Sequence, residues 1–537
     1  MIERRIVRSG AIAALLLVAV LLPSPVAARQ DHPGKASYDK WCAGCHGVDG
    51  QGEGPGAAYM LPRPRNFVQA LYQVRTTRSG SLPTDADILH VIDVGMPGTA
   101  MPGWQTQLNR QERDNLVAYI KTFSRFFETD TPDVLELTSA PRRSDELIEM
   151  GRESYQLLEC WKCHGTTGRG DGQSAPTQED NNQFPIRPAD LTQPWLFNAG
   201  ATVEDIYRTL RTGLDGTPMP SLEDALQGGV VTDEQLWGMA YYVMSLAPDQ
   251  PVVREVIEAR LAEDGLPASP GDSAWNAIDR FWVPLSGQII VPPRWFSPAV
   301  TGIWVQAAYD DSEIAFRLSW DDRSRSPDPV WADWRARVTE VMAPHEGDTA
   351  VPAAGPVADD SATTAAPASP DAIAMWFPRS LPSGMERPYF FMGDARVPVY
   401  MWHWNSQGEG EEMLGRGPGR IDPLPGEGNG LVSDAVFDNG QWSVTFRRPR
   451  VPADSANAIG FVAGAPIPVA FFAWDGDNGE HGTRGALSTW FFVYLTEPTS
   501  AALFATPLFA TLLTAGLGLF VVGRAQRRDR ARNDGGT

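Results

Sequence analysis

All four cysteines of the chain lie in two copies of one short pattern. The copies are Cys42-Ala43-Gly44-Cys45-His46 and Cys160-Trp161-Lys162-Cys163-His164. C-x-x-C-H is the attachment pattern of a c-type haem: two thiols add across the two vinyl groups of one porphyrin, and the histidine becomes an iron ligand. A thioredoxin-like dithiol needs no histidine, and a zinc site would have to join two widely separated pairs. We therefore expect two covalent haem c groups, with His46 and His164 as axial ligands.

Each motif is followed by a loop that contains a methionine. The loops are Gly95-Met96-Pro97-Gly98-Thr99-Ala100-Met101-Pro102 and Gly213-Leu214-Asp215-Gly216-Thr217-Pro218-Met219-Pro220. When the loops are aligned, Met101 matches Met219, whereas Met96 matches a leucine. Met101 and Met219 each lie 55 residues after the histidine of their motif. This equal spacing selects Met101 over Met96, and we expect Met101 and Met219 to be the second axial ligands.

The surroundings of the two motifs also repeat. Helical stretches precede them at 35–41 and 144–159, glycine-rich loops follow at 47–56 and 165–172, and a helix with one apolar face closes each unit. The arrangement resembles a class I cytochrome c, twice in tandem, over residues 31–128 and 144–250. The resemblance implies two all-α domains with His/Met ligation at each iron. A neutral thioether opposite an imidazole favours Fe(II) and raises the reduction potential.

Both ends of the chain carry apolar segments. Residues 1–28 combine a basic start, an apolar run and small residues at a cleavage site, which predicts a secretory signal peptide; the alternative is an uncleaved anchor helix. Residues 499–523 contain no charge and are long enough to form a transmembrane helix. Because arginines are concentrated in residues 524–537, this tail is expected to be cytoplasmic. We expect a single-pass protein of the cytoplasmic membrane with its bulk on the periplasmic side.

The sequence pattern changes from helical to alternating at about residue 264. Ile314, Phe316, Leu318 and Trp320 alternate with other residues, as in a strand with one buried face. Similar strands are expected at 303–309, 397–404, 442–446, 469–474 and 488–495. Many short strands separated by turns predict an all-β sandwich domain over residues 264–497. Its segment 344–371, rich in Ala, Pro and Asp, is expected to be a disordered insertion.

Three segments of this region carry a second resemblance. They are Phe390-Phe391-Met392-Gly393-Asp394, Val399-Tyr400-Met401-Trp402-His403-Trp404 and Trp474-Asp475-Gly476-Asp477-Asn478-Gly479-Glu480. They resemble the haem b subunit of ethylbenzene dehydrogenase and related periplasmic molybdoenzymes. The resemblance implies haem b between a methionine, matched by Met392, and a lysine.

The lysine is missing, because the last lysine of the chain is Lys162. Three alternatives remain: His481 replaces it, another group does, or the domain has lost its haem and serves for docking. His403, which lies between two tryptophans in a strand, is expected to be a packed core residue.

The formal net charge of −21 disfavours nucleic acid as a partner. The resemblances imply an electron-transfer subunit with two haem c groups and an optional haem b. Its partners would be the catalytic and iron–sulfur subunits of a molybdopterin oxidoreductase of the dimethyl sulfoxide reductase or nitrite oxidoreductase type. It would exchange electrons with soluble or membrane carriers of the respiratory chain, and no catalytic residue is expected in the chain itself.

Two other function classes stay open. A dihaem peroxidase or reductase would need an open iron position, so one of the two methionines should be absent or displaced. A cytochrome tethered to a sandwich that binds carbohydrate or protein would need no haem b.

Overall fold

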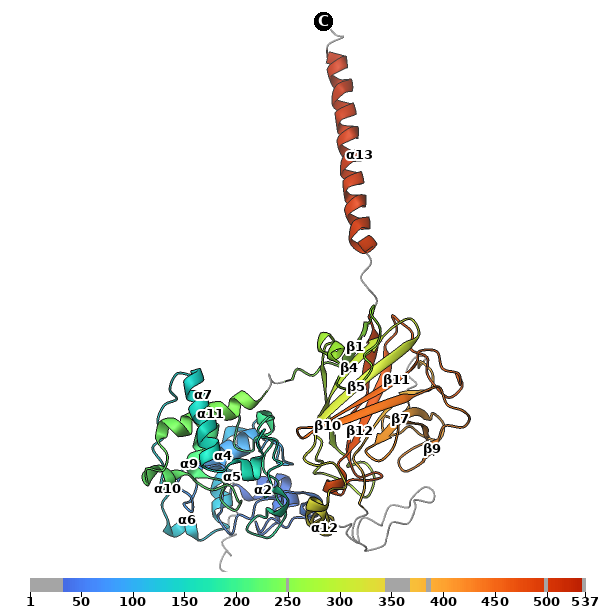
Figure 1. Ribbon diagram of the computed structural model, residues 1–537. Coiled ribbons are helices and arrows are strands. Elements are labelled where there is room, and N and C mark those ends of the chain that lie inside the picture. Colours follow the sequence, from blue (N-terminus) through green and yellow to red (C-terminus); the bar gives the residue numbers. More distant parts are fainter. Residues whose placement is uncertain (1–31, 248–250, 343–367, 383–387, 497–500, 534–537) are drawn as a thin grey trace, which may run out of the picture.

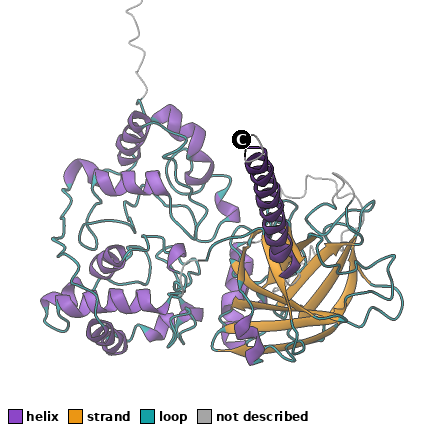
Figure 2. Cartoon of the chain, turned by 90° about the horizontal axis from the view of Figure 1, so that it is seen from above, coloured by secondary structure: helices purple, strands orange, loops and turns teal. Residues whose placement is uncertain are grey.

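The computed structural model describes residues 32–247, 251–342, 368–382, 388–496 and 501–533. The N-terminal half forms a helical part beside a part built of strands, and one long helix, α13, projects away from the strands (Figure 1). Seen from above, the helical part and the strand part lie side by side (Figure 2). The predicted signal peptide at 1–28 lies outside the described residues.

The helical part contains two series of elements that correspond to the sequence repeat. The first series is α2 (Lys35–Trp41), α3 (Ala43–His46), η1 (Ala57–Tyr59), α4 (Asp85–Val94), α5 (Arg110–Lys121) and α6 (Phe126–Thr129). The second series is α7 (Asp145–Leu157), α8 (Trp161–His164), η2 (Ala175–Thr177), η3 (Pro194–Leu196), α9 (Val203–Thr212), α10 (Glu223–Gln227) and α11 (Asp233–Leu246). Capping boxes at Thr84, Asn109, Thr202 and Thr232 start α4, α5, α9 and α11, so equivalent helices begin in the same way.

Helix α2 crosses α5 in the first series and α7 crosses α11 in the second, in each case at a glycine. A Cβ at Gly151 of α7 would lie 2.0 Å from the carbonyl oxygen of Gly238 in α11. In the first series, a Cβ at Gly34, the N-cap of α2, would lie 2.1 Å from the carbonyl oxygen of Asn115 in α5. Only glycine permits this backbone approach, so both repeats depend on the same kind of helix crossing.

Replacing Gly151 by alanine is expected to destabilise the second helical unit. Alanine normally favours a helix over glycine, but here the new methyl group must push α7 away from α11, at a cost of about 1–3 kcal/mol. Thermal unfolding followed by haem absorbance should show a midpoint lower by about 4 °C or more. Gly271→Ala is the control, because no atom lies within 4 Å of a Cβ there. Equal midpoints for the two variants would contradict the close crossing.

The strand part forms one continuous hydrogen-bonded path that folds into two layers. Its strands are β1 (Val256–Leu261), β2 (Phe281–Pro284), β3 (Ser286–Gly287), β4 (Gly302–Tyr309), β5 (Glu313–Asp321), β6 (Ala372–Pro378), β7 (Val399–Asn405), β8 (Glu411–Gly415), β9 (Ile421–Pro423), β10 (Val432–Asp438), β11 (Gln441–Pro449), β12 (Ile467–Trp474), β13 (Ala486–Leu487) and β14 (Phe491–Leu495). The path runs β10-β11-β5-β4-β1-β14-β12-β6-β7-β8-β9. Strand β12 pairs with β14 through 467–469 and with β6 through 470–474, so it passes from one layer into the other.

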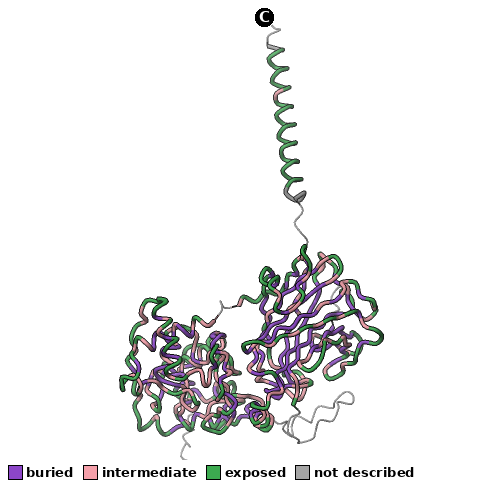
Figure 3. Tube along the Cα trace, in the orientation of Figure 1, coloured by how far each residue is buried: buried purple, intermediate pink, exposed green. Residues whose placement is uncertain are grey.

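The main hydrophobic core lies between these layers. The ring of Phe316 on β5 is 6.2 Å from that of Phe377 on β6 and 5.7 Å from that of Trp402 on β7. The predicted alternation is confirmed, because Ile314, Phe316, Leu318 and Trp320 all belong to this core. Buried stretches follow the strands of this region in Figure 3.

The expectation of an all-β region is wrong at one element, helix α12 (Ala332–Val341). Trp331, Trp334 and Val338 lie at helical spacing and pack against Trp295 of the strand part and Ala175 of the second helical unit. A helix of this length is stabilised by the surfaces on both sides of it rather than by its own sequence. It therefore joins the two parts, as its position in Figure 1 shows.

Two predicted segments are described only in part. Helix α13 (Ala501–Asn533) overlaps the predicted span at 499–523, and its segment Ala505–Ala531 is long and apolar enough to cross a membrane. Residues 344–367 of the predicted insertion lie outside the described residues. Asp371, at the end of that insertion, is described and fully buried immediately before β6.

Candidate haem sites

The two C-x-x-C-H motifs form equivalent helical turns. Each turn ends at a glycine in the left-handed region, Gly47 at φ 77° and Gly165 at φ 78°. The Tyr38 hydroxyl donates to the Gly47 carbonyl oxygen at 2.7 Å, and the Tyr155 hydroxyl donates to that of Gly165 at 2.6 Å. A buried tyrosine from the preceding helix thus holds the end of each motif in place.

The four cysteines are half-buried thiols that are not joined in disulfides. Burial raises the pKa of the Cys42 thiol to about 12 and that of the Cys160 thiol to about 11, and it is the largest cause of both shifts. A redox-active dithiol needs a thiolate at neutral pH, which requires a lowered pKa. Cys42 and Cys160 therefore lack the lowered pKa that a thioredoxin-like dithiol needs.

The two motif histidines are oriented by backbone carbonyls. Nδ1 of His46 lies 3.0 Å from the carbonyl oxygen of Arg65, and Nδ1 of His164 lies 2.9 Å from that of Ala189. Burial lowers the pKa of both imidazoles, which keeps them neutral. With Nδ1–H donated to the carbonyl, Nε2 carries the free lone pair that an iron ligand needs. The residues present therefore fit an axially ligated haem.

The two methionine loops have matching hydrogen bonds. Met96 N–H donates to the Met101 carbonyl oxygen at 3.0 Å, and Leu214 N–H donates to that of Met219 at 3.1 Å. Thr99 accepts from Met101 N–H at 3.1 Å, and the equivalent threonine accepts from Met219 N–H at 3.2 Å. Met101 and Met219 therefore occupy the same position in two copies of one turn, as their equal sequence spacing predicts.

A buried ion pair connects the two helical units at the second methionine loop. The Arg75 side chain, fully buried in the first unit, donates to Asp215 Oδ1 at 2.7 Å and to the Thr212 carbonyl oxygen at 2.5 Å. Asp215 also accepts from Ser79 and from Gly80 N–H of the first unit, both at 2.8 Å. Because Asp215 precedes Met219 by four residues, this contact fixes the second loop relative to the first unit.

Replacing Arg75 by methionine is expected to uncouple the two units. The change leaves the Asp215 carboxylate without its buried cation, and breaking a buried pair in this way costs about 3–5 kcal/mol. Scanning calorimetry of the haem-loaded chain should resolve separate transitions for the units. Arg110→Met removes an exposed pair with Asp114 and is expected to change the stability by about 0.5 kcal/mol or less. Indistinguishable traces for these two variants would contradict a coupling role for Arg75.

The second unit also contacts the strand part close to its motif histidine. Arg323, which follows β5, donates to the Pro188 carbonyl oxygen at 3.0 Å, one residue before the carbonyl that accepts from His164. Arg169 forms an ion pair with Asp321 at the end of β5. The sequence holds no sign of this contact, because its partners are backbone carbonyls and loops far apart in the chain.

The third predicted site lies on the outer face of the β6–β7–β12 layer. Met392 is fully buried and has a positive φ of 56°, which is unusual for a residue with a side chain. It packs in a cluster with Trp376, Phe472 and Trp474, separate from the main core. A buried thioether in a strained backbone conformation is consistent with a ligand position.

Two histidines lie near this cluster, and Trp474 contacts the loop of one and the ring of the other. The Trp474 indole N–H donates to the Gly482 carbonyl oxygen at 3.0 Å, which places the loop of half-buried His481 beside the cluster. The ring of His403 lies 5.9 Å from that of Trp474. His403 is packed as expected, but against this second cluster rather than in the main core, and its side chain is 23% exposed. Alternation along β7 places it on the face of Met401 rather than that of Trp402.

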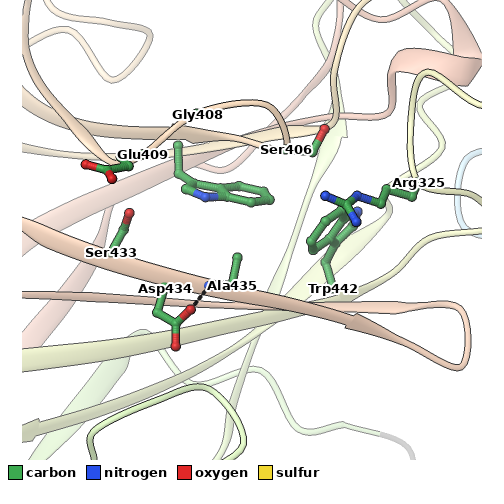
Figure 4. A pocket seen from close by; sticks show the side chains of 9 residues that line it. Arg325, Ser406, Gly408, Glu409, Ser433, Asp434, Ala435 and Trp442 are labelled. Carbon is green, nitrogen blue, oxygen red and sulfur yellow. Dashed lines mark hydrogen bonds between the residues drawn. The ribbon is translucent and has the colours of Figure 1, made fainter.

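The strand part also contains an open polar pocket (Figure 4). Its lining residues are Arg325, Trp404, Ser406, Gly408, Glu409, Ser433, Asp434, Ala435 and Trp442. None of the predicted haem ligands lines it.

Comparison with known proteins gives the helical part its family. The family described as cytochrome c matches residues 32–124 and 148–247. Cytochrome c-554(547) of Halothiobacillus neapolitanus is 34% identical over 90 residues, which cover 17% of this chain and 91% of that protein. The chain belongs to the cytochrome c family. Because the family match occurs twice, this cytochrome contains two such units.

The strand part of the cytochrome matches a second family. The family described as ethylbenzene dehydrogenase matches residues 272–430. A protein of Haloferax mediterranei described as a respiratory nitrate reductase haem subunit is 27% identical over 270 residues, covering 50% of this chain and 81% of that protein. Chlorate reductase subunit gamma of Ideonella dechloratans is 37% identical over 103 residues, covering 19% of this chain and 41% of that protein. The two predicted resemblances are thereby confirmed.

Proposed function

We propose that the chain is a membrane-anchored, periplasmic dihaem c subunit that transfers electrons between a molybdopterin oxidoreductase and the respiratory chain. The matched geometry of the two units carries this proposal: each motif histidine is oriented by a backbone carbonyl, and the methionine 55 residues after it lies in an equivalent turn in both units. Haem held in this way accepts and releases single electrons. Relatives described as subunits of nitrate and chlorate reductases support a molybdenum enzyme as the partner.

The chain's own residues serve transfer rather than substrate chemistry. The carbonyls of Arg65 and Ala189 hold the two imidazoles in one orientation, and the threonine-stabilised turns hold the two thioethers. The Arg75–Asp215 pair fixes one unit against the other, which keeps the distance between the two sites constant. Two matched methionines disfavour a peroxidase or reductase, because that chemistry requires an open iron position.

The strand part and α13 extend the proposal. Met392, with His481 as the second ligand, would hold a haem b on the outer face of the β6–β7–β12 layer. The match to the ethylbenzene dehydrogenase family supports a haem here, although the lysine expected from the resemblance is absent. The exposed apolar helix α13 supports a membrane anchor, and the arginines after it support a cytoplasmic tail.

A haem count on the purified full-length chain tests the proposal. Pyridine haemochrome spectra before and after acid–acetone extraction should give two haem c groups that stay on the polypeptide and one haem b that is extracted. Two haem c groups alone would remove the Met392 site and leave the sandwich as a docking domain. Fewer than two covalent haems, or high-spin ferric iron in the wild type, would refute the electron-transfer assignment.

A further inference from the structure

Three aspartates from distant parts of the sequence meet at one end of the strand part. Asp322 directly follows β5, Asp371 directly precedes β6, and Asp475 directly follows β12. One carboxylate oxygen from each lies within 4.8 Å of the other two. Their exposed fractions are 5%, 0% and 6%, so the cluster is closed to bulk water.

The hydrogen bonds of the cluster satisfy its carboxyl groups only in part. Asp371 accepts from Ser326 N–H at 2.7 Å, from Trp442 Nε1–H at 3.0 Å and from Gly476 N–H at 3.1 Å. Asp475 Oδ1 accepts from Asn478 N–H at 3.0 Å. Asp322 Oδ1 accepts from Ser324 N–H at 3.3 Å, but its Oδ2 is fully buried and has no hydrogen-bond donor.

Nearby charged side chains do not neutralise the three aspartates. Within the described ranges, no Lys, Arg or His nitrogen lies within 4.0 Å of any of their carboxylates. Arg323 interacts electrostatically with Asp322 and Asp475, but its side chain donates to the Pro188 carbonyl oxygen. Arg325 lies over the Trp442 ring, 5.8 Å from its centre. The neighbouring Asp477 forms an ion pair with Arg335, whereas the three aspartates of the cluster have no such partner among the described residues.

Burying several unpaired carboxylates is costly unless protons or a cation neutralise them. Ca²⁺ takes about six to eight oxygen ligands at about 2.3–2.6 Å, so oxygens that share one ion lie no more than about 5 Å apart. One oxygen from each of the three carboxylates meets this limit, so all three can bind one ion. The geometry points to a structural Ca²⁺ site formed by Asp322, Asp371 and Asp475.

The position of the site gives it a role. Asp322 lies between Asp321, which pairs with Arg169, and Arg323, which contacts the Pro188 carbonyl. The segment at Pro188 continues into Ala189, whose carbonyl orients His164. A Ca²⁺ ion that ties the ends of β5, β6 and β12 together thus stabilises the surface on which the second cytochrome unit rests.

Calcium binding is tested on the full-length, haem-loaded chain. After treatment with a chelator and gel filtration, titration with CaCl₂ should show one bound ion per chain, and metal analysis of the untreated protein should agree. Saturating Ca²⁺ should raise the unfolding midpoint by about 5 °C or more, while Mg²⁺ at equal concentration should do less, because Mg²⁺ gives up its hydration water reluctantly and is rarely held by all-protein sites.

Matched variants locate the site. Asp371→Asn and Asp475→Asn should abolish the Ca²⁺-dependent shift, whereas Asp311→Asn, at an exposed turn at the opposite end of β5 from Asp322, should keep it. If a cluster variant fails to fold, the wild-type titration still decides. The absence of bound calcium together with an unchanged midpoint would overturn the site and show that protons neutralise the carboxylates. Equal Ca²⁺-dependent shifts in all variants would also overturn it. The haem count is independent of either outcome, so failure here is distinct from failure of the proposed function.

Discussion

The double variant Cys160→Ala/Cys163→Ala is expected to carry one covalent haem where the wild-type chain carries two. Each motif is a separate helical turn with its own tyrosine and its own carbonyl partner, so losing one pair of thiols leaves the other site intact. Without thioether bonds, a porphyrin in the second unit is held only by axial ligation and packing. Denaturing electrophoresis with haem staining, together with intact mass, should therefore show half the covalent haem of the wild type.

The reciprocal variant Cys42→Ala/Cys45→Ala is the matched control. It should show the same loss in haem content while leaving the spectrum of the second site unchanged. Difference spectra against the wild type then give the individual spectrum of each haem. Retention of two covalent haems in either double variant, or extraction of every haem from the wild type, would contradict attachment at these motifs.

The local chemistry of the haem sites could be predicted from sequence because it depends on short, fixed spacings. The C-x-x-C-H motifs form helical turns, and the two methionines that were matched by spacing occupy equivalent turns. The backbone carbonyls that orient the motif histidines could not be predicted from the sequence, because every residue supplies such a carbonyl. Arg75 likewise resembles any other arginine in the sequence, and only the docking of the two units shows that it is buried.

Long-range topology explains the remaining omissions. Strand β12 brings Asp475 beside Asp371 because it pairs with β6, while Asp322 arrives from β5 in the other layer. No local pattern links three aspartates so far apart in the sequence. Helix α12 was missed for a related reason, because its tryptophans are stabilised by two separate parts of the protein. Alternation did predict the main core strand β5, although small residues on its second face, such as Ala315 and Ser319, are buried as well.

Replacing Met219 by alanine is expected to have the largest effect on electron transfer of any single change outside the motifs. The side chain is the proposed second ligand in the second unit, and alanine offers no atom in its place. The ferric spectrum should gain a high-spin component equal to one haem of the two. The reduction potential of that haem should fall by on the order of 0.1 V, within the range of about 0.8 V that axial ligands span.

The paired methionines of the first loop provide an internal control for this assignment. Met101→Ala should reproduce the effect in the first unit, because Met101 occupies the same turn position as Met219. Met96→Ala removes the same side chain five residues earlier and should leave spin state and potential unchanged, since the repeat places a leucine there. Redox titration monitored by absorbance distinguishes the variants. If Met96→Ala shifts the potential and Met101→Ala does not, the alignment of the two repeats is wrong and the first iron has a different ligand from the one that its spacing indicates.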